Sequence, residues 1–177
     1  MKQKNIILTG FMGSGKTSVG VRLSYRLRMP AEDTDKLIER REGRTVGAIF
    51  AENGEAYFRE QETALLRELL NRKQRCIFSV GGGTPVRPEN RVLLQQLGKV
   101  IYLRTRPETV YRRLKGDTTR PLLQCRNPMK RIEEMLAVRG PLYEEGAMFT
   151  VDVNKLRQSE AAEACIGYLR SAGCAFA

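Results

Sequence analysis

Histidine and tryptophan are both absent from this chain of 177 residues. Without histidine, a zinc site with histidine ligands is excluded, and any general base must be a carboxylate or another unusual group. The four cysteines are scattered and form no Cys-x-x-Cys pair. This usage predicts free thiols in a reducing compartment.

Long apolar runs are missing as well. No run approaches the roughly 18 residues that a membrane-spanning helix requires. The apolar stretch that follows Lys2 and Lys4 is too short for the core of a signal peptide. We therefore expect a cytoplasmic protein without a membrane partner. The length and the 41% of hydrophobic residues suit one folded domain over residues 1–177.

Positive charge is in excess, because 31 lysines and arginines face 20 acidic residues and give a formal charge of +11. Such a charge suits either nucleic acids or polyanionic small molecules. Residues 104–139 contain ten basic and four acidic residues, so +6 of the excess lies in one stretch interrupted by proline and glycine. Aromatic residues make up only 7%, which leaves few platforms for stacking bases. We expect a basic loop that meets a small polyanion, and no nucleic-acid partner.

Short apolar segments alternate with helical patterns along the chain. Strands are expected at residues 5–9, 30–33, 76–80, 100–103 and 149–153. Helices are expected at residues 16–27, 35–41, from Thr45 to Gly54, at 55–70, 107–114 and 128–138, and after Ser159, where Cys165, Tyr168 and Leu169 should face inward. This alternation predicts an α/β fold with a five-stranded parallel sheet covered by helices. Ligands bind beyond the carboxyl ends of such strands.

A glycine-rich motif follows the first expected strand. Residues 10–17 read Gly-Phe-Met-Gly-Ser-Gly-Lys-Thr and match the phosphate loop G-x-x-x-x-G-K-[ST]. Its backbone N–H groups and the next helix favour phosphates, Lys16 would reach the β- and γ-phosphates of a nucleotide, and Thr17 would offer its hydroxyl to Mg²⁺. GTPases, ATPases and kinases share this motif. The residues expected to hold the phosphates are Gly13, Ser14, Gly15, Lys16, Thr17 and Ser18. The alternative is a plain glycine-rich turn before a basic helix.

Three further groups of residues allow both a functional and a structural interpretation. Asp33 and Asp35 could organise the waters of Mg²⁺ and grip a hydroxyl, but such a pair also caps helices. Arg59 could bind a carboxylate through its guanidinium fork, or pair with acidic residues one helical turn away, Glu55 and Glu62. The glycines at 81–83 permit close approach of a ligand or form a flexible turn.

Together with Arg120-Pro121-Leu122-Leu123 and Arg139-Gly140-Pro141-Leu142-Tyr143, these groups resemble the shikimate kinase family from Gly10 to about Asp152. The resemblance implies a three-layer P-loop kinase fold with a mobile lid over residues 112–127 and an acceptor-binding region over residues 33–61. It implies transfer of the γ-phosphate of ATP to the 3-hydroxyl of shikimate, on the pathway to chorismate and the aromatic amino acids, with Mg²⁺ as the cofactor.

The resemblance also assigns roles to residues. Thr17 and Asp33 would lie at the metal, and Lys16, Asp35 and Arg120 would be catalytic. The residues expected to bind shikimate are Asp35, Arg59, Gly82 and Arg139, and those expected to bind ATP outside the phosphate loop are Arg113 (or its neighbour Arg112), Arg120 and, in the loop after Asp152, Leu156. Leu142 and Tyr143 would be packing residues. The chain departs from the family at Glu32, where an apolar residue is usual.

Other functions share parts of this pattern. A kinase for gluconate or for a nucleoside monophosphate would also carry the phosphate loop and acceptor-binding arginines. A nucleic-acid-binding ATPase would account for the charge, and a regulatory protein could bind ATP without catalysis. A signalling GTPase is disfavoured by the length and by the lack of an Asn-Lys-x-Asp motif. For a kinase of this size we expect a monomer.

Overall fold

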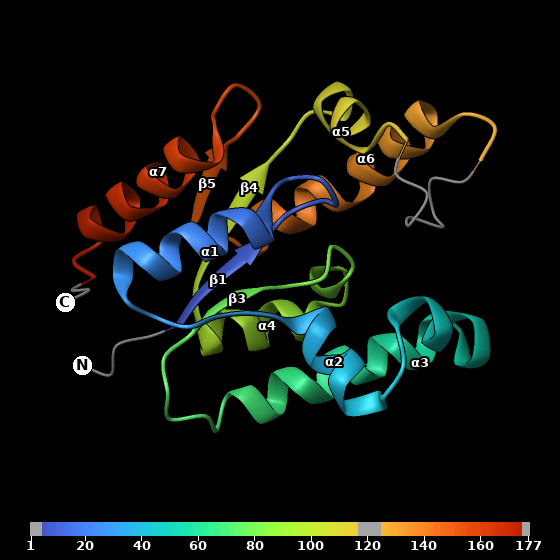
Figure 1. Ribbon diagram of the computed structural model, residues 1–177, viewed down its shortest axis with the longest axis horizontal. Coiled ribbons are helices and arrows are strands. Elements are labelled where there is room, and N and C mark those ends of the chain that lie inside the picture. The colour runs from blue at the N-terminus through green and yellow to red at the C-terminus, as the bar shows by residue number, and fades with distance from the viewer. Residues whose placement is uncertain (1–4, 117–124, 175–177) are drawn as a thin grey trace.

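The computed structural model describes residues 5–116 and 125–174. Its centre is a sheet of five parallel strands in the order β2-β3-β1-β4-β5 (Figure 1). The strands are β1 (Asn5–Thr9), β2 (Ala31–Asp33), β3 (Ile77–Ser79), β4 (Gly98–Arg104) and β5 (Phe149–Asp152). The predicted five-stranded parallel sheet is confirmed. Residues 117–124 of the expected lid lie outside the described residues.

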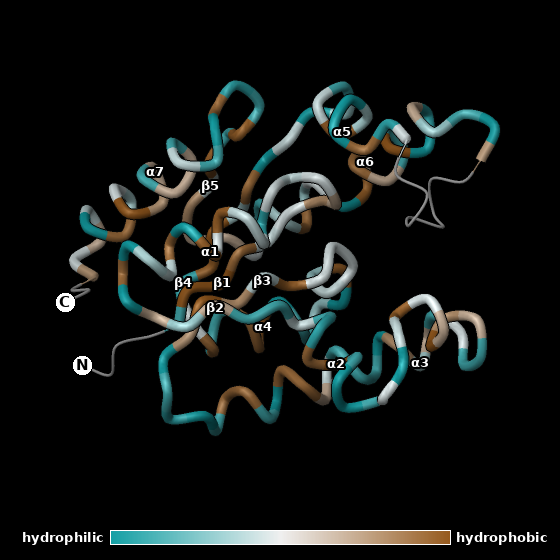
Figure 2. The backbone as a smooth tube through the Cα atoms, in the orientation of Figure 1, coloured by the Kyte–Doolittle hydropathy of each residue, from teal (hydrophilic) through white to brown (hydrophobic). Residues whose placement is uncertain are grey.

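Helices cover both faces of the sheet because successive strand residues point to opposite sides. Ile6 and Leu8 pack against α1 and α7, whereas Ile7 packs on the other face against α3 and α4. Figure 2 shows the hydrophobic residues concentrated in these central strands. The helices are α1 (Lys16–Leu27), α2 (Thr34–Glu42), α3 (Val46–Leu69), α4 (Pro88–Leu97), α5 (Pro107–Leu114), α6 (Pro128–Gly146) and α7 (Gln158–Ser171), with a 3₁₀ turn at Thr84–Val86.

Two glycines end helices where the sequence predicted it. Gly43 follows α2 with a φ of 66°, and Gly54 interrupts α3 with a φ of 81°. A side chain at either position would strain the backbone, because positive φ values are unfavourable for residues with a Cβ. The chain between residues 46 and 69 therefore consists of two helical segments, as predicted, rather than one straight helix.

Four expectations about helices were wrong. Helix α4 was not predicted, and α6 continues through Pro141 to Gly146 instead of ending near residue 138. A proline inside a helix removes one hydrogen bond and crowds the carbonyl one turn earlier, but burial of Tyr143 beyond Pro141 offsets this cost and keeps the segment helical. Helix α7 begins at Gln158 rather than being capped by Ser159. Tyr168 is 43% exposed and stacks on Phe149 instead of facing inward.

Glu32, the departure from the usual apolar residue, has an ion-pair partner. Arg72 donates two hydrogen bonds to its carboxylate, at 2.6 and 2.8 Å. These bonds lower the pKa of Glu32. Strand β2 is at the edge of the sheet, so the charged side chain can meet Arg72 at the surface without entering the core.

The four cysteines are free, as expected, with Cys76 and Cys165 buried. Burial raises the pKa of the Cys165 thiol to about 12. Across residues 5–116 and 125–174, no helix has the length and apolar character needed to cross a membrane.

Gly98 provides a test of the packing between β1 and β4. A Cβ added there would collide with the backbone carbonyl of Asn5, its partner on β1. We expect Gly98→Ala to lower the free energy of unfolding by about 1–3 kcal/mol, measured by urea denaturation. The matched control is Gly167→Ala in α7, where no atom beyond the helix's own backbone and the two neighbouring residues lies within 4 Å of the added carbon. This change should raise stability by up to about 1 kcal/mol. Equal effects of the two changes would contradict the packing argument.

Candidate functional site

The phosphate loop connects the carboxyl end of β1 to α1. Gly13 and Gly15 have φ values of 75° and 92°, which turn the loop back on itself before the helix begins at Lys16. Lys16 donates hydrogen bonds to the carbonyl oxygens of Gly10 and Phe11, at 2.8 and 3.0 Å. The loop and the N-terminus of α1 thus have the geometry of an anion-binding cradle.

Serine side chains complete this loop. Ser14 is buried, and its hydroxyl has no hydrogen-bond partner among the described residues. Ser18 is half-buried in the first turn of α1. Gly10 passes so close to β4 that a Cβ there would lie 2.7 Å from the carbonyl oxygen of Leu103. The loop is therefore held against the end of the sheet.

Asp33 joins the end of β2 to the phosphate loop. One carboxylate oxygen caps α2 by accepting from the backbone N–H groups of Asp35 and Lys36, so the structural interpretation of this pair is correct. The other oxygen accepts a hydrogen bond from the Thr17 hydroxyl at 3.0 Å. The structure therefore brings together the two residues that were predicted at the metal.

Asp35 lies beside the glycine turn that follows β3. A Cβ on Gly81 would be 2.7 Å from Asp35 Oδ1 and 2.8 Å from Glu62 Oε1, so the two carboxylates converge on this glycine. Burial, followed by repulsion from Asp33 and Glu62, raises the pKa of Asp35 to about 6, although the charges of Lys16 and Arg59 oppose the shift. A carboxylate with this pKa is suited to accept a proton near neutral pH.

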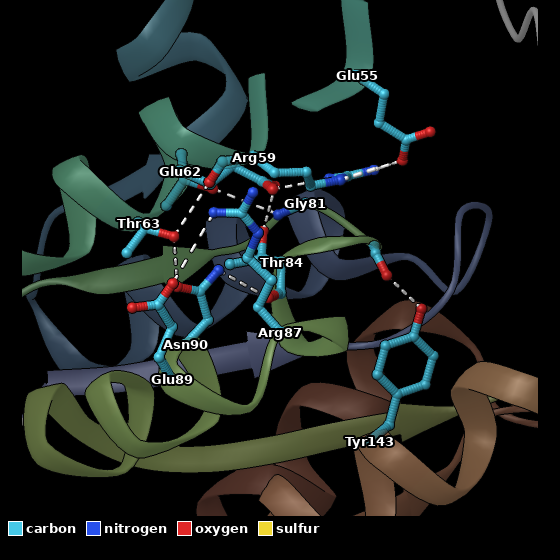
Figure 3. A network of polar contacts seen from close by, with 12 residues as sticks. Glu55, Arg59, Glu62, Thr63, Gly81, Thr84, Arg87, Glu89, Asn90 and Tyr143 are labelled. Carbon is cyan, nitrogen blue, oxygen red and sulfur yellow. Dashed lines mark hydrogen bonds and ion pairs between the residues drawn. The ribbon is translucent and has the colours of Figure 1, made fainter. Parts of the chain in front are cut away.

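Arg59 lies over the same turn. Its guanidinium donates to Glu55 at 2.8 Å and to Glu62 at 2.7 Å, so the expected pairs along the helix exist. The Arg59 side chain is nevertheless only 13% exposed, and its guanidinium occupies the space that a Cβ of Gly83 would need. Figure 3 shows Arg59 with its two acidic partners, Glu55 and Glu62. The two ion pairs therefore hold the guanidinium of Arg59 against the glycine turn, rather than leaving it at the exposed surface of the helix.

Behind Arg59 is a buried polar network. Glu62 is 1% exposed and accepts a hydrogen bond from the Thr84 hydroxyl. Asn90 donates to the Thr84 carbonyl oxygen at 3.0 Å and accepts from the Thr63 hydroxyl at 2.8 Å (Figure 3). Sequence reasoning assigned no role to Asn90, because α4 was not predicted. Pro88, at the first position of α4, is the sequence feature that could have indicated this helix.

Tyr143 connects Gly82 to α6, the helix that carries Arg139. The Tyr143 hydroxyl donates to the Gly82 carbonyl oxygen. Burial raises the pKa of this hydroxyl, and the charge of Arg139, which lies one helical turn earlier on α6, opposes the rise. A Cβ on Gly82 would be 3.4 Å from the Gly10 carbonyl oxygen. The predicted acceptor residue Gly82 therefore lies next to the phosphate loop, and Arg139 lies on the helix whose Tyr143 contacts Gly82.

The remaining predicted ATP residues lie around α5 and the segment after β5. Arg113 donates to the carbonyl oxygens of Gly13 and Val153, at 3.0 Å each, and so links the phosphate loop to the expected adenine loop. This contact favours Arg113 over Arg112. Leu156 is partly buried against the core between the sheet and α1 and α7. Arg120 lies outside the described residues.

Comparisons with known proteins agree with this geometry. A family model described as "Shikimate kinase" matches residues 12–170. A shikimate kinase of Thioalkalivibrio sulfidiphilus is 46% identical over 85% of this chain and 79% of its own length, and one of Caldanaerobacter subterraneus is 41% identical over 96% and 99%. The chain belongs to the shikimate kinase family. The expectation of an ATP-dependent P-loop kinase is therefore confirmed.

Solved structures support the same family. A shikimate kinase from Acinetobacter baumannii, solved in complex with shikimate, matches with a TM-score of 0.90 and 38% identity over 96% of this chain and 94% of its own. A gluconokinase of Sinorhizobium meliloti matches with a TM-score of 0.53 and only 16% identity, so it shares the fold alone. The shikimate kinase family is thus separated from the gluconate kinases that sequence reasoning kept open.

The raised pKa of Asp35 predicts how stability depends on pH. The folded state binds the Asp35 proton more tightly than the unfolded state, so its contribution is most favourable below pH ~4 and is lost as the pH rises through about 6. We expect Asp35→Asn to raise the free energy of unfolding by up to about 3 kcal/mol at pH 7.5, and by about 1 kcal/mol at pH 4.5, in urea titrations.

Asp152→Asn is the matched control. Hydrogen bonds from Asn154, first from its backbone, lower the pKa of Asp152, so this carboxylate stabilises the fold above its unfolded pKa. The same chemical change should therefore reduce stability at pH 7.5. A stability gain for Asp35→Asn that did not change with pH would contradict the burial of its charge.

Proposed function

We propose that this protein transfers the γ-phosphoryl group of ATP to the 3-hydroxyl of shikimate. The observation that carries the proposal is the convergence of Asp35 and Arg59 on the glycine turn that contains Gly82, beside the phosphate loop. Membership of the shikimate kinase family supports the choice of acceptor, as does the relative from Acinetobacter baumannii whose structure is described as a complex with shikimate.

In this proposal, the phosphate loop binds ATP. The N–H groups around Gly13 and Gly15 and the N-terminus of α1 face the phosphate oxygens, with the hydroxyls of Ser14 and Ser18 nearby. Lys16 gives up its hydrogen bonds to the carbonyl oxygens of the loop and binds the β- and γ-phosphates instead. Arg113, fixed between Gly13 and Val153, borders the adenine together with Leu156.

The residues that would hold Mg²⁺ are Thr17 and Asp33. Their oxygens lie 3.0 Å apart at the mouth of the loop, and Mg²⁺ prefers such a small set of hydroxyl, carboxylate and phosphate oxygens with several waters. The donor set therefore fits this ion. Bound there, Mg²⁺ supplies positive charge that offsets the charge on the β- and γ-phosphates.

Shikimate carries a carboxylate and three hydroxyls. The arginines and the carboxylate around the glycine turn are suited to bind these two kinds of group. Arg59 and Arg139 bind the carboxylate, since a guanidinium offers two parallel donors to it. Gly82 lets the acceptor approach the backbone. Asp35 holds the reacting hydroxyl and takes its proton, because most of its carboxylate is ionised at pH 7 with a pKa of about 6.

We further propose that the chain acts as one domain over residues 1–177, as a cytoplasmic monomer, with an acceptor-binding region at residues 33–61 and a lid at residues 112–127. The excess positive charge then serves ATP and shikimate rather than nucleic acid. Closure of the lid brings Arg120 to the phosphates and excludes water from the transfer.

The acceptor can be tested by ADP release from Mg·ATP with shikimate, quinate, gluconate, AMP or single-stranded DNA. We expect strong turnover with shikimate alone. Lys16→Ala and Arg139→Ala should abolish it, because they remove phosphate and carboxylate binding. Turnover with a different acceptor would contradict the roles of Asp35, Arg59 and Arg139. ATP binding without turnover on any acceptor would indicate a binding protein.

The role of Arg120 predicts a specific kinetic pattern. Arg120→Ala should lower kcat by about 100-fold while the KM for shikimate changes little, because the cation acts on charge that develops during transfer. Steady-state kinetics at saturating ATP measures both values. The neighbouring change Gln124→Ala is the control and should leave kcat within about twofold. An unchanged kcat for Arg120→Ala would contradict this role.

A further inference from the structure

The residue that connects the parts of the acceptor site is Tyr143, for which the sequence indicated packing alone. Its side chain is 1% exposed, and its ring packs against Tyr102 with centroids 5.1 Å apart. The same core cluster contains Phe11 of the phosphate loop. The ring thus fills a space between α6, β4 and the loop, while its hydroxyl reaches the glycine turn.

The hydroxyl of Tyr143 joins α6 to the glycine turn. Arg139 and Tyr143 are four residues apart on α6 and therefore share one face of that helix. The tyrosine proton goes to the Gly82 carbonyl, so the tyrosine oxygen can accept a hydrogen bond, and the guanidinium of Arg139 on the same helix face can only donate. A cationic donor polarises the hydroxyl and strengthens the bond that it makes to Gly82.

The bond to Gly82 fixes more than one atom. The peptide between Gly82 and Gly83 is planar, so holding its carbonyl also sets the direction of the Gly83 N–H. Arg59 lies over Gly83 from the other side of the turn, opposite Tyr143 in the view of Figure 3. The peptide that Tyr143 holds is therefore the same one that Arg59 lies against.

We propose that Tyr143 is a positioning residue for the acceptor: its hydroxyl aligns Arg139 with the Gly82–Gly83 peptide, so that the two carboxylate-binding elements are preorganised before shikimate binds. Tyr143 does not touch the reacting atoms. The inference rests on the proposed function, because it assigns Tyr143 to the binding of the same acceptor. Removal of its hydroxyl leaves Arg139 and the turn free to rearrange, and shikimate binding must then order them.

The test is Tyr143→Phe, which removes one oxygen and keeps the ring. We expect the KM and the calorimetric Kd for shikimate to rise roughly five- to tenfold, which corresponds to the loss of one hydrogen bond to a neutral partner such as the Gly82 carbonyl. The kcat and the KM for ATP should stay within about twofold, because the hydroxyl acts on acceptor binding rather than on transfer. The matched control is Tyr102→Phe, a buried ring in contact with Tyr143, and its KM for shikimate should stay within about twofold.

A double-mutant cycle separates positioning from packing. If Tyr143 acts through Arg139, then adding Tyr143→Phe to Arg139→Lys should weaken shikimate binding less than it does in the wild type. Full additivity would overturn the proposal, and so would an unchanged KM in a Tyr143→Phe variant whose Tm alone is lower. A wild-type protein that neither binds nor phosphorylates shikimate would refute the proposed function and this inference together. Wild-type activity with unchanged binding by Tyr143→Phe would refute this inference alone.

Discussion

The buried carboxylate of Glu62 is the constraint on which the site depends. A charge at 1% exposure is tolerated only when it is paired and hydrogen-bonded, and Glu62 obtains both from Arg59 and from the Thr84 hydroxyl. Those two partners stand on different elements, α3 and the turn after β3. The need to satisfy one buried charge thus determines how the helix that carries Arg59 is placed against the glycine turn.

The turn itself is the point where charge accumulates. Gly81 leaves room for the carboxylates of Asp35 and Glu62, and Gly83 leaves room for the guanidinium of Arg59. The proximity of the two carboxylates adds to the effect of burial and keeps the pKa of Asp35 high, while Arg59 limits the rise. The same crowding that destabilises ionised Asp35 therefore makes it a better proton acceptor near neutral pH, a common exchange of stability for chemistry.

Local features were predictable from the sequence to the extent that their energies are local. The phosphate loop, the glycine ends at Gly43 and Gly54, and the burial of alternate strand residues follow from backbone preferences and short-range periodicity. Errors occurred where distant contacts override those preferences. The burial of Tyr143 carries α6 past Pro141, and Tyr168 stacks on Phe149 at the surface although its spacing suggested the core.

The sequence by itself determined the kind of chemistry: a phosphate loop, two neighbouring carboxylates, arginines for an acid, and no histidine to serve as base. Only the tertiary structure decided which of these groups meet. The contact of Thr17 with Asp33, the network from Glu62 through Thr84 to Asn90, and the hydrogen bond from Tyr143 to Gly82 join residues on separate elements. Such contacts depend on how strands and helices pack, and no local pattern in the chain encodes the partner of a side chain across the sheet.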